Sequence, residues 1–180
     1  TFVVMNHVCA AGTGRFIEEQ AQKLNCPLSQ YSDRAAPRQS PISSDRCTVF
    51  MERDLNHYLN MGYPVDDVLA AVLHSVRENY LAKVAGENRI GDVISFQGAT
   101  AKNKALVAAF EKRLGKSIMV SRYCHLTGAL GVALMLFDQP PAATRFRGLD
   151  LYKKDIPLHN ETCDLCTNHC KLTVAEVDGA

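Results

Sequence analysis

Residues 9–16 read Cys-Ala-Ala-Gly-Thr-Gly-Arg-Phe, and they join an expected strand to an expected helix. The apolar run at residues 1–5 predicts a buried strand before it, and apolar side chains at helical spacing predict a helix over residues 15–24. A small-residue turn between a strand and a helix lets backbone N–H groups approach an anion at the helix N-terminus. We therefore predict a phosphate-binding turn, although a tight turn without a ligand has the same pattern. Its residues are Gly12, Thr13 and Gly14.

Beyond this turn the sequence alternates helical segments with short apolar strands. A loop rich in Pro, Ser, Asp and Arg is expected over residues 26–45, and Ser43, Ser44 or Asp45 could cap the helix after it. This order predicts an α/β domain over residues 1–138, a linker over 139–160 and the start of a further cysteine-rich region over 161–180. The expected helices are 47–59, 64–84, 104–114 and 126–137, and the expected strands are 92–96 and 117–120.

Composition narrows the class of protein. The chain has 180 residues, 47% of them apolar and 22% charged, which is typical of a globular domain. Its net charge of +1 gives no reason to expect a nucleic-acid or membrane partner. No apolar run reaches the roughly 18 residues that a membrane span needs, and no secretion signal is visible, so we expect a cytoplasmic protein. The chain begins on an apolar run at Thr1, which suggests a cut inside a larger fold.

Seven cysteines indicate metal binding or thiol chemistry more than a disulfide framework, because the count is odd and some spacings are short. Cys9 and Cys47 both lie where a helix is expected to begin, a position that favours the thiolate form that binds metals. The alternative is that each is an ordinary buried cysteine. Three more cysteines form a Cys-x2-Cys-x3-Cys pattern near the end of the chain: Cys163, Cys166 and Cys170.

Two further turns could contact a nucleotide. Gly98 and Ala99 follow an expected strand, and a small pair at this point, with Asn103 after it, lets the backbone lie flat against a planar ring. Residues 125–131, which include Gly128 and Gly131, would allow a helix to pack closely nearby. An ordinary strand-to-helix turn would also explain the first pattern.

These segments occur together and in order, and they resemble the activator ATPases of 2-hydroxyacyl-CoA dehydratases and benzoyl-CoA reductases. The resemblance covers about residues 1–138. It rests on residues 6–16, on Cys-Thr-Val-Phe at 47–50, on Gly98-Ala99 with Asn103, and on residues 126–131. It implies half of an actin, sugar kinase and heat-shock type ATPase fold, which is ribonuclease H-like.

The resemblance also implies an electron-transfer function. In such activators a 4Fe–4S cluster bridges two modules, and the matching ligands here are Cys9 and Cys47. ATP with Mg would bind at Gly12, Thr13 and Gly14 and at Gly98, Ala99 and Asn103, and its hydrolysis would drive one electron to an acyl-CoA dehydratase or reductase. The second module would come from a homodimer or from the same chain.

Departures from the family pattern limit this expectation. His7-Val8 stands where the family often has Asp-Lys, and Ala99 stands where it often has Gly. The first half of the family fold, with its own phosphate loop and metal-linked acidic residue, is not in this sequence. We assign no catalytic residue and expect the chain alone to bind ATP weakly and to hydrolyse it poorly.

The tail leaves two readings open. Larger activator-like proteins carry tandem modules and then a further cysteine-bearing region. Three soft ligands at Cys163, Cys166 and Cys170 suit a zinc or iron–sulfur site that needs a fourth ligand, for which His169 is a candidate. An empty site on an unordered tail is the alternative.

Two other functions compete with the activator. The first is a zinc-stabilised interaction module without a redox role, which would be colourless where the activator would be brown. The second is a sugar-kinase-like phosphotransferase, which is disfavoured because that chemistry does not use the cysteines and no catalytic Asp is found in the expected loop.

Overall fold

The computed structural model describes residues 3–4, 13–36, 38–86, 90–144 and 146–177. The chain divides into two compact units, Thr1–Met135 and Leu136–Ala180. Each unit is described by itself below.

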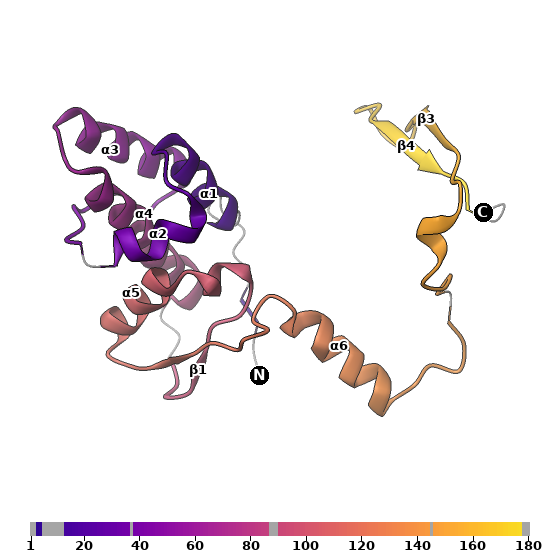
Figure 1. The fold of residues 1–180 in the computed structure, drawn as a ribbon. Helices are drawn as coiled ribbons and strands as arrows, with labels where there is room; N and C mark the ends of the chain where they lie inside the picture. Colours follow the sequence, from indigo (N-terminus) through magenta and orange to yellow (C-terminus); the bar gives the residue numbers. More distant parts are fainter. Residues whose placement is uncertain (1–2, 5–12, 37, 87–89, 145, 178–180) are drawn as a thin grey trace. The chain divides into compact units, whose positions relative to one another are not determined.

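The first unit is built from helices and one small sheet (Figure 1). Its α-helices are α1 (Thr13–Lys23), α2 (Leu28–Ala35), α3 (Thr48–Asn60), α4 (Val65–Tyr80) and α5 (Lys104–Leu114), and α6 (Thr127–Asp138) crosses the boundary between the units. Shorter elements are a π-helix (Leu81–Ala85), a 3-10 helix (Ala99–Lys102), β1 (Ile94–Ser95) and β2 (Ile118–Met119).

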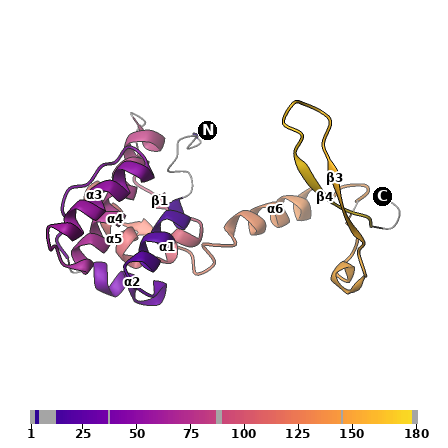
Figure 2. The same ribbon diagram turned by 90° about the horizontal axis from the view of Figure 1, so that it is seen from above.

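Helix α4 is the centre of the core. It contacts α1, α2, α3 and α5, and these helices lie around it (Figure 2). Val68, Leu69 and Val72 on α4 are fully buried. Phe16 and Ile17 of α1 pack into the same cluster, so burial of one wide apolar stripe holds the helices together.

A parallel pair of strands flanks α5. Ile94 of β1 pairs with Ile118 of β2, and α5 connects the two strands along the chain. Asn103 caps the start of α5, and Gly115 ends it at φ +64°, a left-handed conformation that glycine adopts without strain. The helix predicted over residues 104–114 is confirmed at both ends.

Helix α2 corrects the predicted loop over residues 26–45. The Pro, Ser, Asp and Arg content of residues 26–45 is typical of a loop. Residues 28–35 are nevertheless helical, because Tyr31 and Ala35 on one face of the helix are buried in the core. Tyr31 is 1% exposed, and its hydroxyl donates a 3.0 Å hydrogen bond to the Leu69 carbonyl. Burial raises the pKa of Tyr31, so this phenol remains a donor.

Other expectations need smaller corrections. Helix α3 is capped by Cys47 and not by Ser43, Ser44 or Asp45. Helix α4 ends at Tyr80, where the backbone changes to the π-helix. Val3 and Val4 are exposed and belong to no strand, and the rest of the strand predicted over residues 1–5 lies outside the described residues.

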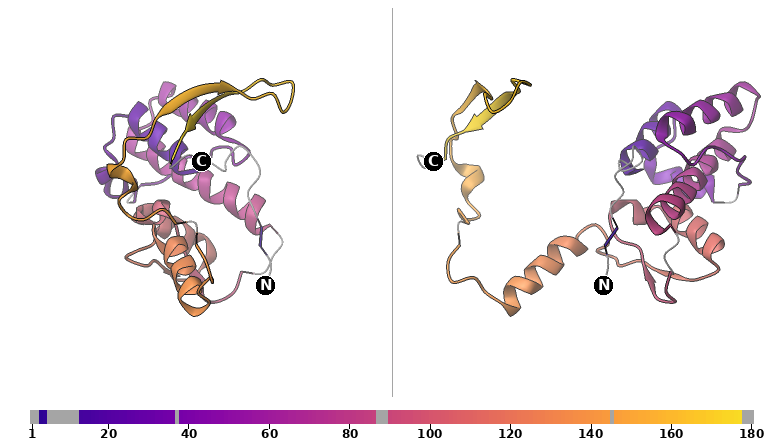
Figure 3. Two further views of the ribbon diagram at one scale, coloured as in Figure 1. Left: turned by 90° about the vertical axis from the view of Figure 1, so that its right-hand side faces the viewer. Right: turned by 180° about the vertical axis from the view of Figure 1, so that it is seen from behind.

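The second unit carries a β-hairpin (Figure 3). A 3-10 helix (Leu151–Lys153) precedes β3 (Leu158–Thr162), which pairs antiparallel with β4 (Lys171–Ala175). The first strand begins inside the segment predicted as a linker. No residue described after Met135 is buried, so this unit has no hydrophobic core of its own within its described part. Across the described residues of the whole chain, no helix combines the length and the apolar character that a membrane crossing requires.

His74 makes the stability of the first unit depend on pH. Burial on α4, with the positive charges of Arg77 and Lys112 nearby, lowers the pKa of His74 from its usual 6.5. The unfolded chain therefore binds the proton first, and stability should fall as the pH drops below 6.5 toward the lower folded pKa. We expect His74→Gln to flatten this part of the profile, measured as the unfolding temperature between neutral and mildly acidic pH. An unchanged slope would contradict the assignment to His74.

Candidate functional site

The turn at Gly98 brings two predicted segments together. Gly98 has φ +96° and ψ 168°, a backbone conformation that is essentially restricted to glycine. Its N–H donates a 2.7 Å hydrogen bond to the Cys124 carbonyl, and the Thr127 hydroxyl donates to the same carbonyl at 3.1 Å. The strand-to-helix turn at Gly98 is therefore joined to the start of α6.

The N-terminus of α1 lies against this turn. A Cβ atom placed on Gly14 would lie 3.2 Å from Cγ2 of Thr100, so the Thr100 side chain packs closely against the Gly14 backbone. Thr100 belongs to the 3-10 helix that begins directly after Gly98. Segments separated by more than eighty positions in the sequence thus meet at one place.

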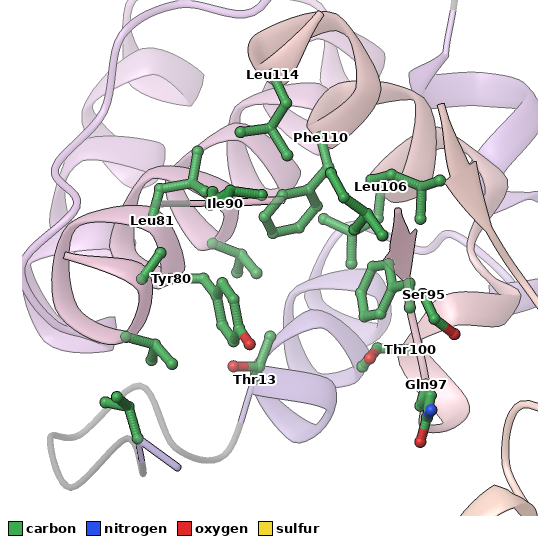
Figure 4. Close-up of a pocket in the computed structure, with 17 residues that line it drawn as sticks. Thr13, Tyr80, Leu81, Ile90, Ser95, Gln97, Thr100, Leu106, Phe110 and Leu114 are labelled. Carbon is green, nitrogen blue, oxygen red and sulfur yellow. The ribbon is translucent and has the colours of Figure 1, made fainter. Parts of the chain in front are cut away.

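A pocket of about 600 Å³ opens beside this meeting point (Figure 4). Leu106, Phe110 and Leu114 form part of its apolar wall. Thr13 and Thr100 contribute hydroxyl groups on the opposite side in the view, with Gln97 beside Thr100. The wall can accept an apolar or planar group, and the polar side chains can contact a charged one.

Asn103 has a structural role. Its Oδ1 accepts hydrogen bonds from the Leu106 N–H at 3.1 Å and from the Ser32 hydroxyl at 3.0 Å. The side chain therefore caps α5 and ties that helix to α2. Its predicted contact with a nucleotide stays a prediction.

Cys47 sits at the N-terminus of α3. It is the N-cap residue, has an extended backbone, is partly exposed, and makes no capping hydrogen bond through its side chain. The helix N-terminus places partial positive charge beside this thiol. By contrast Cys26 and Cys124 are buried.

Polar residues that were not predicted hold the backbone just before Cys47. Nδ2 of Asn79 donates to the carbonyls of Asp45 at 2.5 Å and Arg46 at 2.8 Å. Asn79 is 1% exposed, and Ser75, one turn earlier on α4, hydrogen-bonds Ser43. The signal was present in the sequence, since Ser75 and Asn79 interrupt the apolar stripe of α4.

Asp54 fixes the same segment from the other side. Its Oδ2 accepts a 2.9 Å hydrogen bond from the Ser44 N–H. Partial burial would raise the pKa of Asp54, but hydrogen bonds from Arg53 and from the Ser44 N–H outweigh it and lower the pKa. Asp54 is thus ionised at neutral pH and anchors the approach to Cys47.

The remaining predicted site residues are placed as follows. Cys9 and Gly12 lie outside the described residues, so a meeting of Cys9 with Cys47 stays a prediction. Thr13 and Gly14 begin α1.

In the tail Cys163 is partly exposed, and Cys166 and Cys170 are exposed. Among the described residues no three potential ligand side chains stand close enough to hold a metal ion. Gly128 and Gly131 have no neighbour within 4 Å of a Cβ position, so the close packing expected there is not observed.

A pair of Asn103 variants tests whether this side chain stabilises α5 as its N-cap. Asn103→Ala removes the acceptor of the Leu106 N–H and should lower the free energy of unfolding by about 1 kcal/mol. Asn103→Asp keeps a capping oxygen and should stay close to wild type in chemical denaturation. Equal losses for both variants would contradict the capping role.

Solved structures of related proteins share this fold. Component A of the (R)-2-hydroxyglutaryl-CoA dehydratase of Acidaminococcus fermentans aligns over 74% of this chain and 52% of its own, with 32% identity and a TM-score of 0.68. The activator of the 2-hydroxyisocaproyl-CoA dehydratase from Clostridium difficile, with bound ADPNP, aligns over 74% of this chain and 50% of its own, with 30% identity and a TM-score of 0.65. The fold is therefore of the α/β ATPase type found in activator structures.

Sequence comparison agrees with the structural one. The 2-hydroxyisocaproyl-CoA dehydratase activator of Clostridioides difficile is 34% identical over 139 residues, which are 76% of this chain and 51% of the relative. The chain thus spans about half the length of such relatives. The model of the BadF/BadG/BcrA/BcrD ATPase family matches residues 2–135. The chain belongs to the BadF/BadG/BcrA/BcrD ATPase family.

Proposed function

We propose that this chain is part of an ATP-dependent activator that delivers one electron to a 2-hydroxyacyl-CoA dehydratase or a related acyl-CoA reductase. The observation that carries the proposal is the meeting of the Gly14, Gly98 and Thr127 segments beside a pocket that Thr13 and Thr100 line, in a member of an ATPase family. Relatives named as dehydratase activators, one of them solved with ADPNP, support the same function.

ATP would bind at this meeting point. Gly12, Thr13 and Gly14 would bind the phosphates. Thr13 and Gly14 begin α1, whose N-terminus has backbone N–H groups and a hydroxyl for this purpose. Gly98 and Ala99 would contact the adenosine, because the turn presents backbone without a side chain at Gly98. Mg would bind with the phosphates. The unit would then be one half of an actin, sugar kinase and heat-shock type ATPase, and a second half would complete the site.

Cys9 and Cys47 would hold a 4Fe–4S cluster between two such modules, each of which supplies two thiolates. Four thiolates are the usual ligand set of this cluster, which supplies one-electron transfer when bound. This chain would provide a partly exposed thiol at the head of α3, partial positive charge from that helix, and a fixed backbone approach. Asn79 and Asp54 are the positioning residues of that approach.

The assembly would act on a dehydratase in the cytoplasm. Two modules, in a homodimer or in one longer chain, would present the cluster to the dehydratase. Thiolates that must stay reduced to bind iron suit the cytoplasm, where thiols are kept reduced.

Anaerobic reconstitution with iron and sulfide tests the proposal. We expect a brown protein whose reduced form gives the electron paramagnetic resonance signal of a 4Fe–4S cluster, and we expect Mg-ADPNP to alter that signal. A colourless protein that retains zinc instead would support an interaction module and would contradict the activator.

A further inference from the structure

The hairpin of the second unit places two cysteines opposite each other. Thr162 pairs with Lys171 as the last pair of the antiparallel register, and Cys163 and Cys170 follow directly on the two sides of the loop. The Cys163 N–H donates a 2.8 Å hydrogen bond to the Cys170 carbonyl, so the pairing continues to this point. Directly opposed residues share one face of a hairpin, with Cβ atoms about 5 Å apart.

A third thiol lies on the loop that these two close. Cys166 is exposed within residues 163–170, which join β3 to β4. A loop of this length lets Cys166 fold back toward the opposed pair without breaking the strand pairing. Three thiolates on one short loop are a ligand set that soft metal ions select.

His169 offers a fourth ligand. It has φ +46°, which breaks the strand alternation that would otherwise send it to the face opposite Cys170. Its Nδ1 lies 3.7 Å from Oδ1 of Asp164, which is near but too long for a hydrogen bond. A histidine that binds a metal usually presents its other ring nitrogen to a carboxylate, so Nε2 is the atom left for the metal.

Burial of side chains contributes little stability to the described part of the second unit. None of its described residues is buried, and an isolated two-stranded hairpin is at best marginally stable in water. Small units without a core are commonly held by a structural metal ion. A metal at the loop would tie both strands at the point where they diverge.

We propose that the loop of the second unit binds one Zn²⁺ through the thiolates of Cys163, Cys166 and Cys170 and through Nε2 of His169. The described side chains do not form this set in the unliganded hairpin. Binding therefore includes closure of residues 164–169 around the ion, with loss of the thiol protons, as in other sites where metal binding and folding are coupled.

This site is independent of the proposed activator function. It uses cysteines of the second unit only, and Cys9 and Cys47 have no part in it. The test is therefore made on the full chain with Cys9→Ser and Cys47→Ser, so that a cluster at those positions cannot supply the metal signal.

The experiment titrates this background with Co²⁺ and then with Zn²⁺, anaerobically. We expect one Co²⁺ per chain with the visible absorption of a tetrahedral thiolate site, and its displacement by Zn²⁺. Hydrogen exchange at the Cys163 amide should slow when Zn²⁺ is bound. Cys166→Ser should weaken binding by roughly 100-fold or more. Thr167→Ser, next to it on the loop, keeps all four ligands and should bind as the background does.

Three results would contradict the zinc site, the choice of metal or the fourth ligand. Absence of a tetrahedral cobalt spectrum, or equal binding by Cys166→Ser and Thr167→Ser, would overturn the site. A brown product with iron and sulfide in preference to zinc would overturn the choice of metal. Unchanged affinity in His169→Gln would overturn the fourth ligand. Cys166 is exposed, so its loss does not threaten the core of the first unit.

Discussion

Replacement of Cys47 by serine should abolish iron–sulfur cluster binding without unfolding the protein. A serine oxygen is a poor ligand for this cluster, and loss of one thiolate from each of two modules removes half of the ligand set. Serine is also a better N-cap than cysteine for α3, because its hydroxyl accepts a backbone N–H that Cys47 leaves without a side-chain partner. We therefore expect iron and sulfide to fall to background, while the unfolding temperature stays equal or rises.

A matched control uses a buried cysteine that is not a helix N-cap residue. Cys26 is buried, and its thiol lies 3.6 Å from the Pro27 carbonyl. Cys26→Ala removes one thiol and a little packing, and the reconstituted variant should keep its full iron content. Retention of iron in Cys47→Ser, or equal loss in Cys26→Ala, would remove Cys47 from the cluster site.

Substitution of Gly98 by alanine should weaken both the fold and nucleotide binding. At φ +96° and ψ 168° any side chain strains the backbone, at a cost of about 1–3 kcal/mol. A Cβ there would meet no atom within 4 Å, so backbone strain alone accounts for the loss. A shift of the turn would move the surface proposed to contact adenosine. We expect affinity for Mg-ADPNP, measured by calorimetry, to fall by about tenfold or more.

Gly115 supplies the control for strain. It also has positive φ and open space around a Cβ, but it ends α5 and does not belong to the Gly98 turn. Gly115→Ala should lose about 1–2 kcal/mol of stability and bind Mg-ADPNP as wild type does. If both variants lose affinity equally, the effect is loss of stability, and the assignment of Gly98 to the nucleotide site is wrong.

The sequence predicted the helices that are marked by regular apolar spacing and by a capping residue. Helix α5 could be read from its apolar spacing and from Gly115, and the family could be read from the cysteine and glycine motifs. Helix α2 could not, because its polar composition resembles a loop. Only the packing of Tyr31 against α4 shows why this segment is helical.

In the candidate site, too, local patterns were predicted and contacts between distant residues were not. The Gly98 turn and Cys47 at a helix start were visible as patterns. The approach of Gly14 to Thr100 and the hydrogen bonds from Asn79 to the carbonyls before Cys47 join residues far apart in sequence. Such contacts depend on the register of whole helices, and nothing in the local sequence determines that register.

Native mass spectrometry of the anaerobically reconstituted protein tests the central claim most directly. If Cys9 and Cys47 of two modules share one cluster, the brown species should have the mass of two chains plus a single 4Fe–4S cluster. Variants at Cys166 and Cys170 should give the same assembly. A single chain that carries iron, or iron that disappears only when the tail cysteines are replaced, would contradict the account.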